Sequence, residues 1–408
     1  MTRKLHFICF VLGALSLLGG LSACRERSTE DEHVLRVGLI VSLTGPARYW
    51  GLVTMRSAQV AAQYYNERGG FDLDGEKVKI ELVVVDDAFD SVQAARVAHS
   101  MVSDGIRYII GPLGDSTLAA AGRVLDGSGA FYVHYGFHRE VQSTSSLGVL
   151  GMPLPEQSLP VMLRHLRDQQ GVERVLVMAY GTEEGVRQKG IAEQVAINEG
   201  LQLVQLARYD VSEETFDVSL DPGRIQRKVR RVADAAPEAL IVVGCPPEAF
   251  IVLVDRLRSG GYAGIIGTQN TQDPEYLARL GEASEDVYYV GGAPPDALRS
   301  DYFESLRDRY LDLADEWDEE ANTKLYALEF ILACIRVAGL DALEETSVMY
   351  RVLPEFSFED PFYREPQQVS LLGGQDEGVP LQLQIPIRIS RMSGGQAIVV
   401  EEAKRVRP

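Results

Sequence analysis

Short, uninterrupted apolar runs rich in valine and isoleucine recur along this chain, and a helical pattern follows most of them. Such runs are typical of strands in a parallel sheet, because helices cover both faces of that sheet. The alternation therefore predicts a doubly wound α/β fold. In the first part of the chain the expected strands are LRVGLIVSL, KVKIELVVVDD, RYIIGP and AFYVHY, and the expected helices span 52–68, 91–103 and 116–126.

The pattern restarts after the proline-containing junction GVLGMPLPEQS. A second set of strands is expected at RVLVMAY, LQLVQLARY, ALIVVG and GIIGT, with helices over 159–169, 185–198, 225–235 and 248–259. The segment VYYVGGAPPD then predicts a second crossing, after which helices at 302–313 and 321–337 return to the first lobe. The chain therefore contains two α/β lobes of similar size.

We expect two doubly wound parallel-sheet lobes, joined by hinge crossings, with a ligand cleft where the carboxyl ends of the strands face each other. The first lobe is expected to comprise residues 35–153 and 291–345, and the second residues 154–290 and 346–408. The last 60 residues are strand-rich, and VPLQLQIPIRISRM alternates as half-buried strands do. Their topology is not determined by this pattern.

The N-terminus has the composition of a secretory signal. TRK supplies positive charge, LHFICFVLGALSLLGGL is apolar, and LSAC ends the segment. This ending resembles the lipobox of bacterial lipoproteins, which implies a signal peptide over 1–23, a lipidated Cys24 and a polar stalk over 24–34. No later stretch is apolar over the ~20 residues that a membrane span needs. We therefore expect an extracytoplasmic monomeric body tethered to a membrane by lipid.

The net charge of the chain and its lack of common catalytic motifs argue against several classes of function. The 408 residues carry a net charge of −19, which argues against a nucleic-acid partner. The chain contains no G-x-S-x-G, P-loop, H-E-x-x-H or Cys/His zinc spacing, so we expect neither an enzyme nor a cofactor or metal. After processing, Cys245 and Cys334 remain. A disulfide is permitted outside the cytosol, but their separate apolar contexts favour two buried thiols.

Several segments carry a family resemblance: GLIVSLTGPARYWG, YYNERGGFDLDGEKVKIELVVVDD, IIGPLGDSTLAAAGRVLDGSG and, in the second half, FDVSLDPGRIQRKVRRVADAAPEALIVVGCPPEAFIVLVDRLRSGGYAG. In this order they resemble the solute-binding proteins of branched-chain amino-acid-type ABC transporters, which are type I periplasmic binding proteins. The likeness runs from about Leu35 to Ala342. It implies capture of a small-molecule solute for a membrane permease. A scaffold or sensor lipoprotein with the same fold but no transport role remains the alternative.

The resemblance also implies which positions contact the solute. In the family, a serine after the Gly-Pro turn and a threonine one strand later hold an amino acid's carboxylate. An acid in the second lobe holds its ammonium group, and aromatic residues line both lobes. Trp50 keeps the first-lobe aromatic, whereas the other positions differ here. The candidate ligand-binding residues are Trp50, Asp115, Ser116, Gly136 through its carbonyl, His138, Glu184 at the second-lobe aromatic position, and Gln269 at the acid position.

Asp115 stands where the family receives a carboxylate at a helix N-terminus, a place that favours anions. Two like charges ~4 Å apart at an effective dielectric constant of ~20 repel by about 4 kcal/mol. We therefore expect leucine, isoleucine and valine not to bind, and either a cation over Trp50 or an uncharged polar solute to bind instead. Asp115 could also be a simple N-cap of the helix from Ser116. The acidic run DLADEWDEEA, over 312–321, is interpreted as a solvated helix end.

Overall fold

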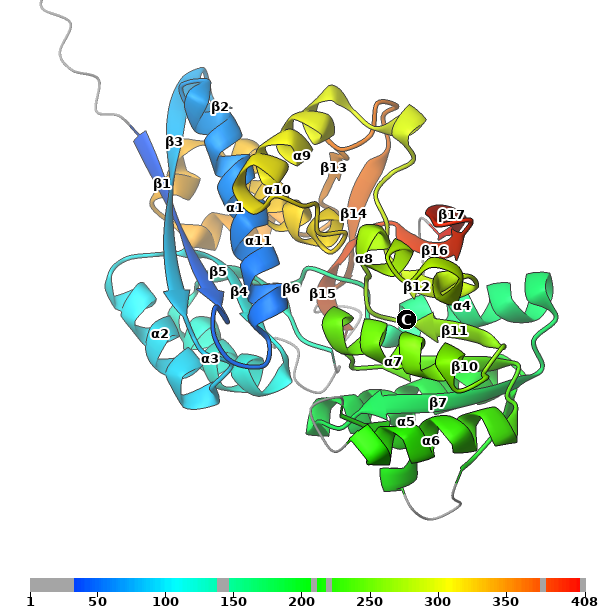
Figure 1. Cartoon of the computed structure of the whole chain (residues 1–408). Helices are drawn as coiled ribbons and strands as arrows, with labels where there is room; N and C mark the ends of the chain where they lie inside the picture. Colours follow the sequence, from blue (N-terminus) through cyan, green and yellow to red (C-terminus); the bar gives the residue numbers. More distant parts are fainter. Residues whose placement is uncertain (1–32, 138–146, 207–210, 218–221, 375–378, 404–408) are drawn as a thin grey trace, which may run out of the picture. The chain divides into compact units, whose positions relative to one another are not determined.

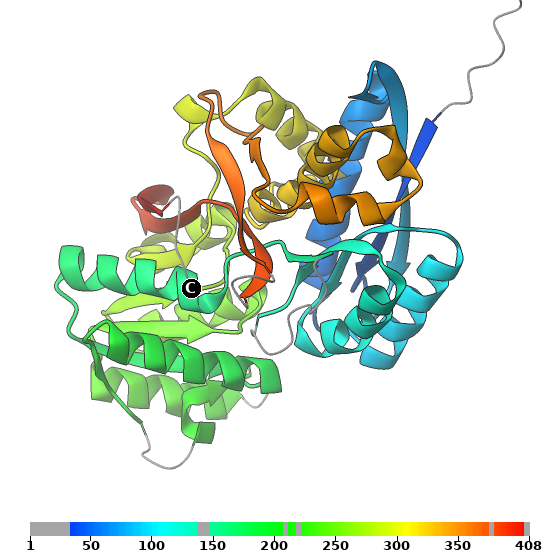
Figure 2. The same cartoon turned by 180° about the vertical axis from the view of Figure 1, so that it is seen from behind.

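The computed structural model describes residues 33–137, 147–206, 211–217, 222–374 and 379–403 (Figures 1 and 2). These residues belong to one compact unit that begins at His33. The predicted signal peptide, Cys24 and His138 lie outside them. His33 and Val34, which we expected in the stalk, already belong to the first strand.

The first sheet has nine strands in the order β13-β14-β15-β6-β5-β4-β1-β3-β2. Its strands are β1 (His33–Val41), β2 (Phe71–Leu73), β3 (Glu76–Asp86), β4 (Tyr108–Leu113), β5 (Phe131–Tyr135), β6 (Gly148–Leu150), β13 (Ser357–Glu359), β14 (Gln368–Gly374) and β15 (Val379–Gln384). The central strands β6, β5, β4, β1 and β3 are parallel. The order reverses between β1 and β4, so the sheet is doubly wound and its switch point lies there.

Helices cover both faces of this sheet. They are α1 (Arg48–Glu67), α2 (Ser91–Ser103), α3 (Asp115–Ser128), α9 (Asp301–Ala314), α10 (Ala321–Ala338) and α11 (Met349–Val352), with 3-10 turns η4 (Asp296–Leu298), η5 (Leu340–Leu343) and η6 (Thr346–Val348). Alternate residues of one strand enter different cores. Tyr108 and Ile110 pack on the α1 and α10 side, whereas Ile109 packs on the α2 and α3 side. This explains why the strand sequences are apolar without interruption.

The second sheet repeats the plan with the order β17-β16-β12-β11-β10-β7-β8, and β9 also pairs with β7. Its strands are β7 (Arg174–Tyr180), β8 (Gln202–Leu203), β9 (Thr215–Phe216), β10 (Ala239–Val243), β11 (Ile265–Thr268), β12 (Val287–Val290), β16 (Ile387–Ser393) and β17 (Gln396–Ala403). Its helices are α4 (Pro155–Gln170), α5 (Glu183–Asn198), α6 (Pro222–Ala235), α7 (Pro247–Ser259) and α8 (Pro274–Ala278), with 3-10 turns η2 (Val211–Glu214) and η3 (Gly281–Ser284). The predicted fold of two doubly wound α/β lobes is confirmed.

The chain passes between the sheets three times, but the third crossing comes later than the expected lobe boundary at 345/346. The first two crossings follow β6 and β12, as the sequence predicts, and the third joins β15 to β16 at Ile385 and Pro386. β15 pairs in parallel with β6, whereas β16 pairs antiparallel with β12 (Figure 1). The expected placement of 346–408 in the second lobe is therefore wrong for residues 346–374 and 379–384, which belong to the first lobe. Strand periodicity shows that a segment is half-buried, but it does not show against which sheet.

Two other features of the chain bear on its function. Cys245 and Cys334 are free and buried, so the prediction of two separate thiols is confirmed. Among the helices of the described ranges, none combines the length and the apolar character that a membrane crossing requires.

Candidate functional site

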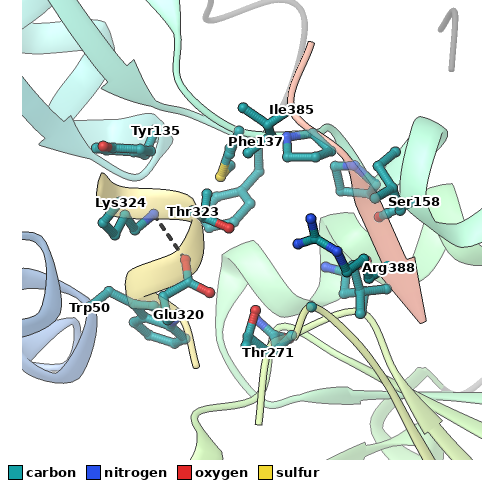
Figure 3. Close-up of a pocket in the computed structure, with 18 of the residues that line it drawn as sticks. Trp50, Tyr135, Phe137, Ser158, Thr271, Glu320, Thr323, Lys324, Ile385 and Arg388 are labelled. Atoms are coloured by element: carbon teal, nitrogen blue, oxygen red, sulfur yellow. Dashed lines mark ion pairs between the residues drawn. The ribbon is translucent and has the colours of Figure 1, made fainter. Parts of the chain in front are cut away.

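A cavity of about 90 Å³ lies where the three crossings converge (Figure 3). Each crossing contributes to its wall, through Met152 and Pro153, through Gly291, and through Ile385 and Pro386. The remaining lining residues come from strand ends and from helices: Trp50, Leu113, Tyr135, Phe137, Pro155, Ser158, Gln269, Asn270, Thr271, Val290, Glu320, Thr323, Lys324, Ile387 and Arg388. The carboxyl ends of β4, β5 and β11 thus reach the cavity, which is where open α/β sheets bind ligands.

The first-lobe wall contains a buried ion pair on α10. The Nζ atom of Lys324 lies 3.0 Å from Oε1 of Glu320, and the Lys324 side chain is only 2% exposed. The same ammonium group lies 3.7 Å from the centroid of the Tyr135 ring. Burial lowers the pKa of Lys324, and the charge of Glu320 opposes that effect. The residues are four apart, so one helix face presents both (Figure 3).

The second-lobe wall is polar, and some of its buried polar atoms lack a hydrogen-bond partner in the described chain. Arg388 on β16 is buried, and its Nη2 atom has no hydrogen-bond partner within the described ranges. The side-chain oxygens of Gln269 and Asn270, which follow β11, are also buried without a partner there. A buried polar group that lacks a partner costs about 1–3 kcal/mol. Three residues that line the cavity, Arg388, Gln269 and Asn270, thus each have a buried polar atom without a partner in the described chain.

The structure brings Trp50 and Gln269 together at this cavity but does not place Asp115, Ser116, Gly136 or Glu184 on its wall. Ser116 is exposed and Gly136 is buried. His138 lies outside the described residues. Direct contact between these positions and a solute stays a prediction.

Asp115 does not cap its helix. Gly114 occupies the N-cap position with φ +82°, a left-handed conformation that suits glycine, and α3 begins at Asp115. The Asp115 side chain is 1% exposed. Its Oδ1 atom accepts the N–H of Phe137 at 2.7 Å, and its Oδ2 atom lies 3.9 Å from Nη2 of Arg187. The carboxylate is thus held by the protein itself, and the hypothesis of an N-cap is wrong.

Arg187 also connects Asp115 with Glu184. Its Nη2 atom lies 3.3 Å from Oε2 of Glu184, while Oε1 of Glu184 accepts from Nε2 of Gln188 at 2.9 Å. Gln269 donates its Nε2 to Oε1 of Gln188. The positions that hold an amino acid in the family resemblance are therefore linked here by side chains of α5.

Sequence reasoning missed Glu320, Lys324 and Arg388. Glu320 is only 9% exposed, so the interpretation of 312–321 as a solvated helix end is wrong for the second part of that run. A signal existed, since Lys324 begins the largely apolar part of α10 and stands four residues after Glu320, the spacing at which helical side chains meet. Arg388 gave no such signal, because it lies between Ile387 and Ile389 on the opposite face of β16, where strand alternation places a polar residue.

Comparison with known proteins shows which proteins are similar to this chain. The family model described as "Periplasmic binding protein" matches residues 34–368. The Leu/Ile/Val-binding protein BraC3 of Rhizobium johnstonii is 36% identical over 99 residues. That alignment covers 24% of this chain and 26% of BraC3, so the chain matches only about a quarter of that relative's length.

Solved structures are similar over nearly the whole chain. The branched-chain amino acid transporter substrate-binding protein LivJ of Streptococcus pneumoniae, in complex with isoleucine, has a TM-score of 0.70 at 18% identity and covers 91% of this chain and 100% of its own. A solute-binding protein of an ABC transporter from R. palustris, in complex with benzoate, has a TM-score of 0.71 at 14% identity, covering 92% and 97%. At these identities the likeness shows the fold alone.

Proposed function

We propose that this chain captures a small polar solute in the cavity at the three crossings and delivers it to the permease of an ABC importer. The proposal follows from the family, because the chain belongs to the periplasmic binding proteins. We further propose that lipid on Cys24 tethers the protein to a membrane on its extracytoplasmic side. The family is not one of enzymes, and the proposal needs no catalytic residue or cofactor.

The observation that carries the proposal is the set of buried polar atoms on the cavity wall that lack partners. Arg388, Gln269 and Asn270 each contribute one such atom within the described chain. Protein interiors satisfy most buried polar groups, so a set that converges on one cavity is expected where a ligand completes it. A scaffold without a ligand would instead fill this space with its own side chains, which supports capture over the scaffold alternative.

The proposed solute is not leucine, isoleucine or valine. Asp115 is buried at the position that receives a carboxylate in the family resemblance, so a ligand carboxylate placed at that position would meet its negative charge. Gln269 stands at the position of the ammonium-binding acid, and its amide is neutral. Isoleucine is bound by the S. pneumoniae neighbour, whereas both of the charged ends of an amino acid would lack their usual partners here.

A thermal-shift screen of the mature body against a metabolite library tests solute capture. A solute present at 100 times its Kd stabilises the protein by about 2.7 kcal/mol. Thr323→Trp fills the cavity from α10, and Val337→Trp on the same helix is the matched control because Val337 is 67% exposed. We expect a metabolite that raises the Tm of the wild type and of Val337→Trp but not that of Thr323→Trp.

Two outcomes would contradict the proposal. A metabolite that stabilises Thr323→Trp as strongly as the wild type binds outside the cavity. A library in which no compound stabilises the wild type favours the scaffold or sensor alternative.

A further inference from the structure

We infer that Arg388 is the anchor for a carboxylate of the solute, and that the solute is a small hydroxy acid without an ammonium group. This inference rests on the proposed function, since it names the chemical class that the cavity captures. It adds a binding residue from β16, the strand that follows the third crossing, in a part of the chain whose topology the sequence did not determine.

The guanidinium group of Arg388 is fixed on one side by the protein. Nε donates to Oε2 of Glu402 at 2.9 Å, and Nη1 donates to the carbonyl oxygen of Gly292 at 3.0 Å. The ring of Tyr363 lies 5.3 Å from the guanidinium carbon, and the hydroxyl of Tyr363 donates to the same Glu402 oxygen at 3.2 Å. These contacts set the orientation of a side chain that is only 5% exposed.

The other side of the guanidinium group faces the cavity. Figure 3 shows the side chain of Arg388 directed from β16 into the space between Ser158, Thr271 and Thr323. Nη2 carries two N–H donors, and it is buried without a hydrogen-bond partner in the part of the chain that the structure describes. Its orientation is fixed before a solute arrives, so little conformational entropy is lost on binding.

A carboxylate is the acceptor that pairs best with this guanidinium donor. Hydrogen bonds between guanidinium and carboxylate are roughly twice as strong as bonds between neutral groups, and they strengthen where water is excluded. The second cation on the wall does not compete for the carboxylate, because Lys324 is paired with Glu320 at 3.0 Å and lies against Tyr135. Arg388 is thus the cationic donor with an open position.

The rest of the solute must supply donors. The side-chain oxygens of Gln269 and Asn270 are buried acceptors without a described partner, and a hydroxyl group satisfies such an acceptor. An ammonium group would need a carboxylate, but Glu320 already pairs with Lys324. A hydroxy acid therefore replaces the cation or uncharged solute that the sequence favoured, because the sequence did not reveal the position of Arg388.

Saturation-transfer NMR with lactate and lactamide tests the inference on the folded mature body. The two probes have the same shape, and only lactate carries a charge. Arg388→Lys keeps a cation beside Glu402 but removes Nη2. Arg391→Lys is the matched control on the same strand, because Arg391 pairs with Asp286 and does not line the cavity.

We expect lactate to bind the wild type and Arg391→Lys equally, and Arg388→Lys at least tenfold more weakly. Lactamide should bind all three proteins no better than lactate binds Arg388→Lys. Equal binding of lactate and lactamide to the wild type overturns the carboxylate anchor but leaves solute capture in place. Unchanged lactate affinity in Arg388→Lys also overturns it, as does the absence of lactate binding to the wild type. The comparison of the two probes needs no variant, so it decides the matter even if Arg388→Lys does not fold.

Discussion

Replacing Asp273 with asparagine should make this protein more stable above neutral pH. Asp273 is 4% exposed and caps α8, where its Oδ1 atom accepts the N–H of Glu275 at 2.7 Å and that of Tyr276 at 3.3 Å. Burial raises the pKa of its carboxyl from 3.8 to about 6, and the nearby charges of Glu316 and Asp318 act in the same direction. Asparagine caps helices as well as aspartate does, so the change removes the buried charge and keeps the cap.

The sign and size of the stability change follow from the shift in the pKa of Asp273. Because the folded pKa of Asp273 is higher than the unfolded one, the stability that its protonated form contributes is complete below about pH 3.8 and is lost as the pH rises through 6. A shift of about two units corresponds to about 3 kcal/mol above pH 7, since one unit is 1.36 kcal/mol. Asparagine is neutral throughout, so Asp273→Asn should gain about 1–3 kcal/mol at pH 8. At pH 4.5 the gain should fall to about a third of that value, because most of the wild-type carboxyl is then protonated when folded.

Urea unfolding of both proteins at pH 8 and pH 4.5 measures this difference. Asp90→Asn is the matched control, since Asp90 caps α2 by accepting the N–H of Gln93 at 2.7 Å but is exposed. The control should change stability by less than about 0.5 kcal/mol at either pH. A loss of stability for Asp273→Asn at pH 8, or a gain that is equal at both pH values, would refute the reasoning.

Three further predictions concern the cavity, the solute and the anchor. Lys324→Met should lower the free energy of unfolding in urea by about 3–5 kcal/mol, because it leaves the buried Glu320 without its cation. Adding Glu320→Gln should recover at least half of that loss, whereas a loss below about 1 kcal/mol would mean that the pair is solvated. Isothermal titration with leucine, isoleucine and valine should show no binding, and micromolar affinity for any of them would show that Asp115 does not oppose a ligand carboxylate. Cys24→Ser should move the protein from the membrane fraction to the soluble fraction or block its processing, whereas unchanged membrane association on immunoblots would remove the lipid anchor.

The sequence alone determined most of the architecture, because strand and helix periodicities are local. α2 begins and ends where its pattern does, at Ser91 and Ser103. The runs that became β7 and β10 are buried as their composition indicates. Trp50 and Gln269, which the family resemblance in the sequence indicated, both line the cavity.

The tertiary structure decided which polar groups meet. Asp115 has the expected place at the start of α3, yet its carboxylate binds Phe137 and Arg187, which are distant in the sequence. Arg388 reaches the cavity because β15 joins the first sheet and β16 joins the second, a choice that strand alternation leaves open. Whether a buried donor has a hydrogen-bond partner depends on packing between segments that are distant in the sequence, and local periodicity does not reveal that packing. The periodicity of the chain therefore specified the two lobes, whereas the packing of β16 against β12 and β17 left one nitrogen of Arg388 without a partner among the residues that the structure describes.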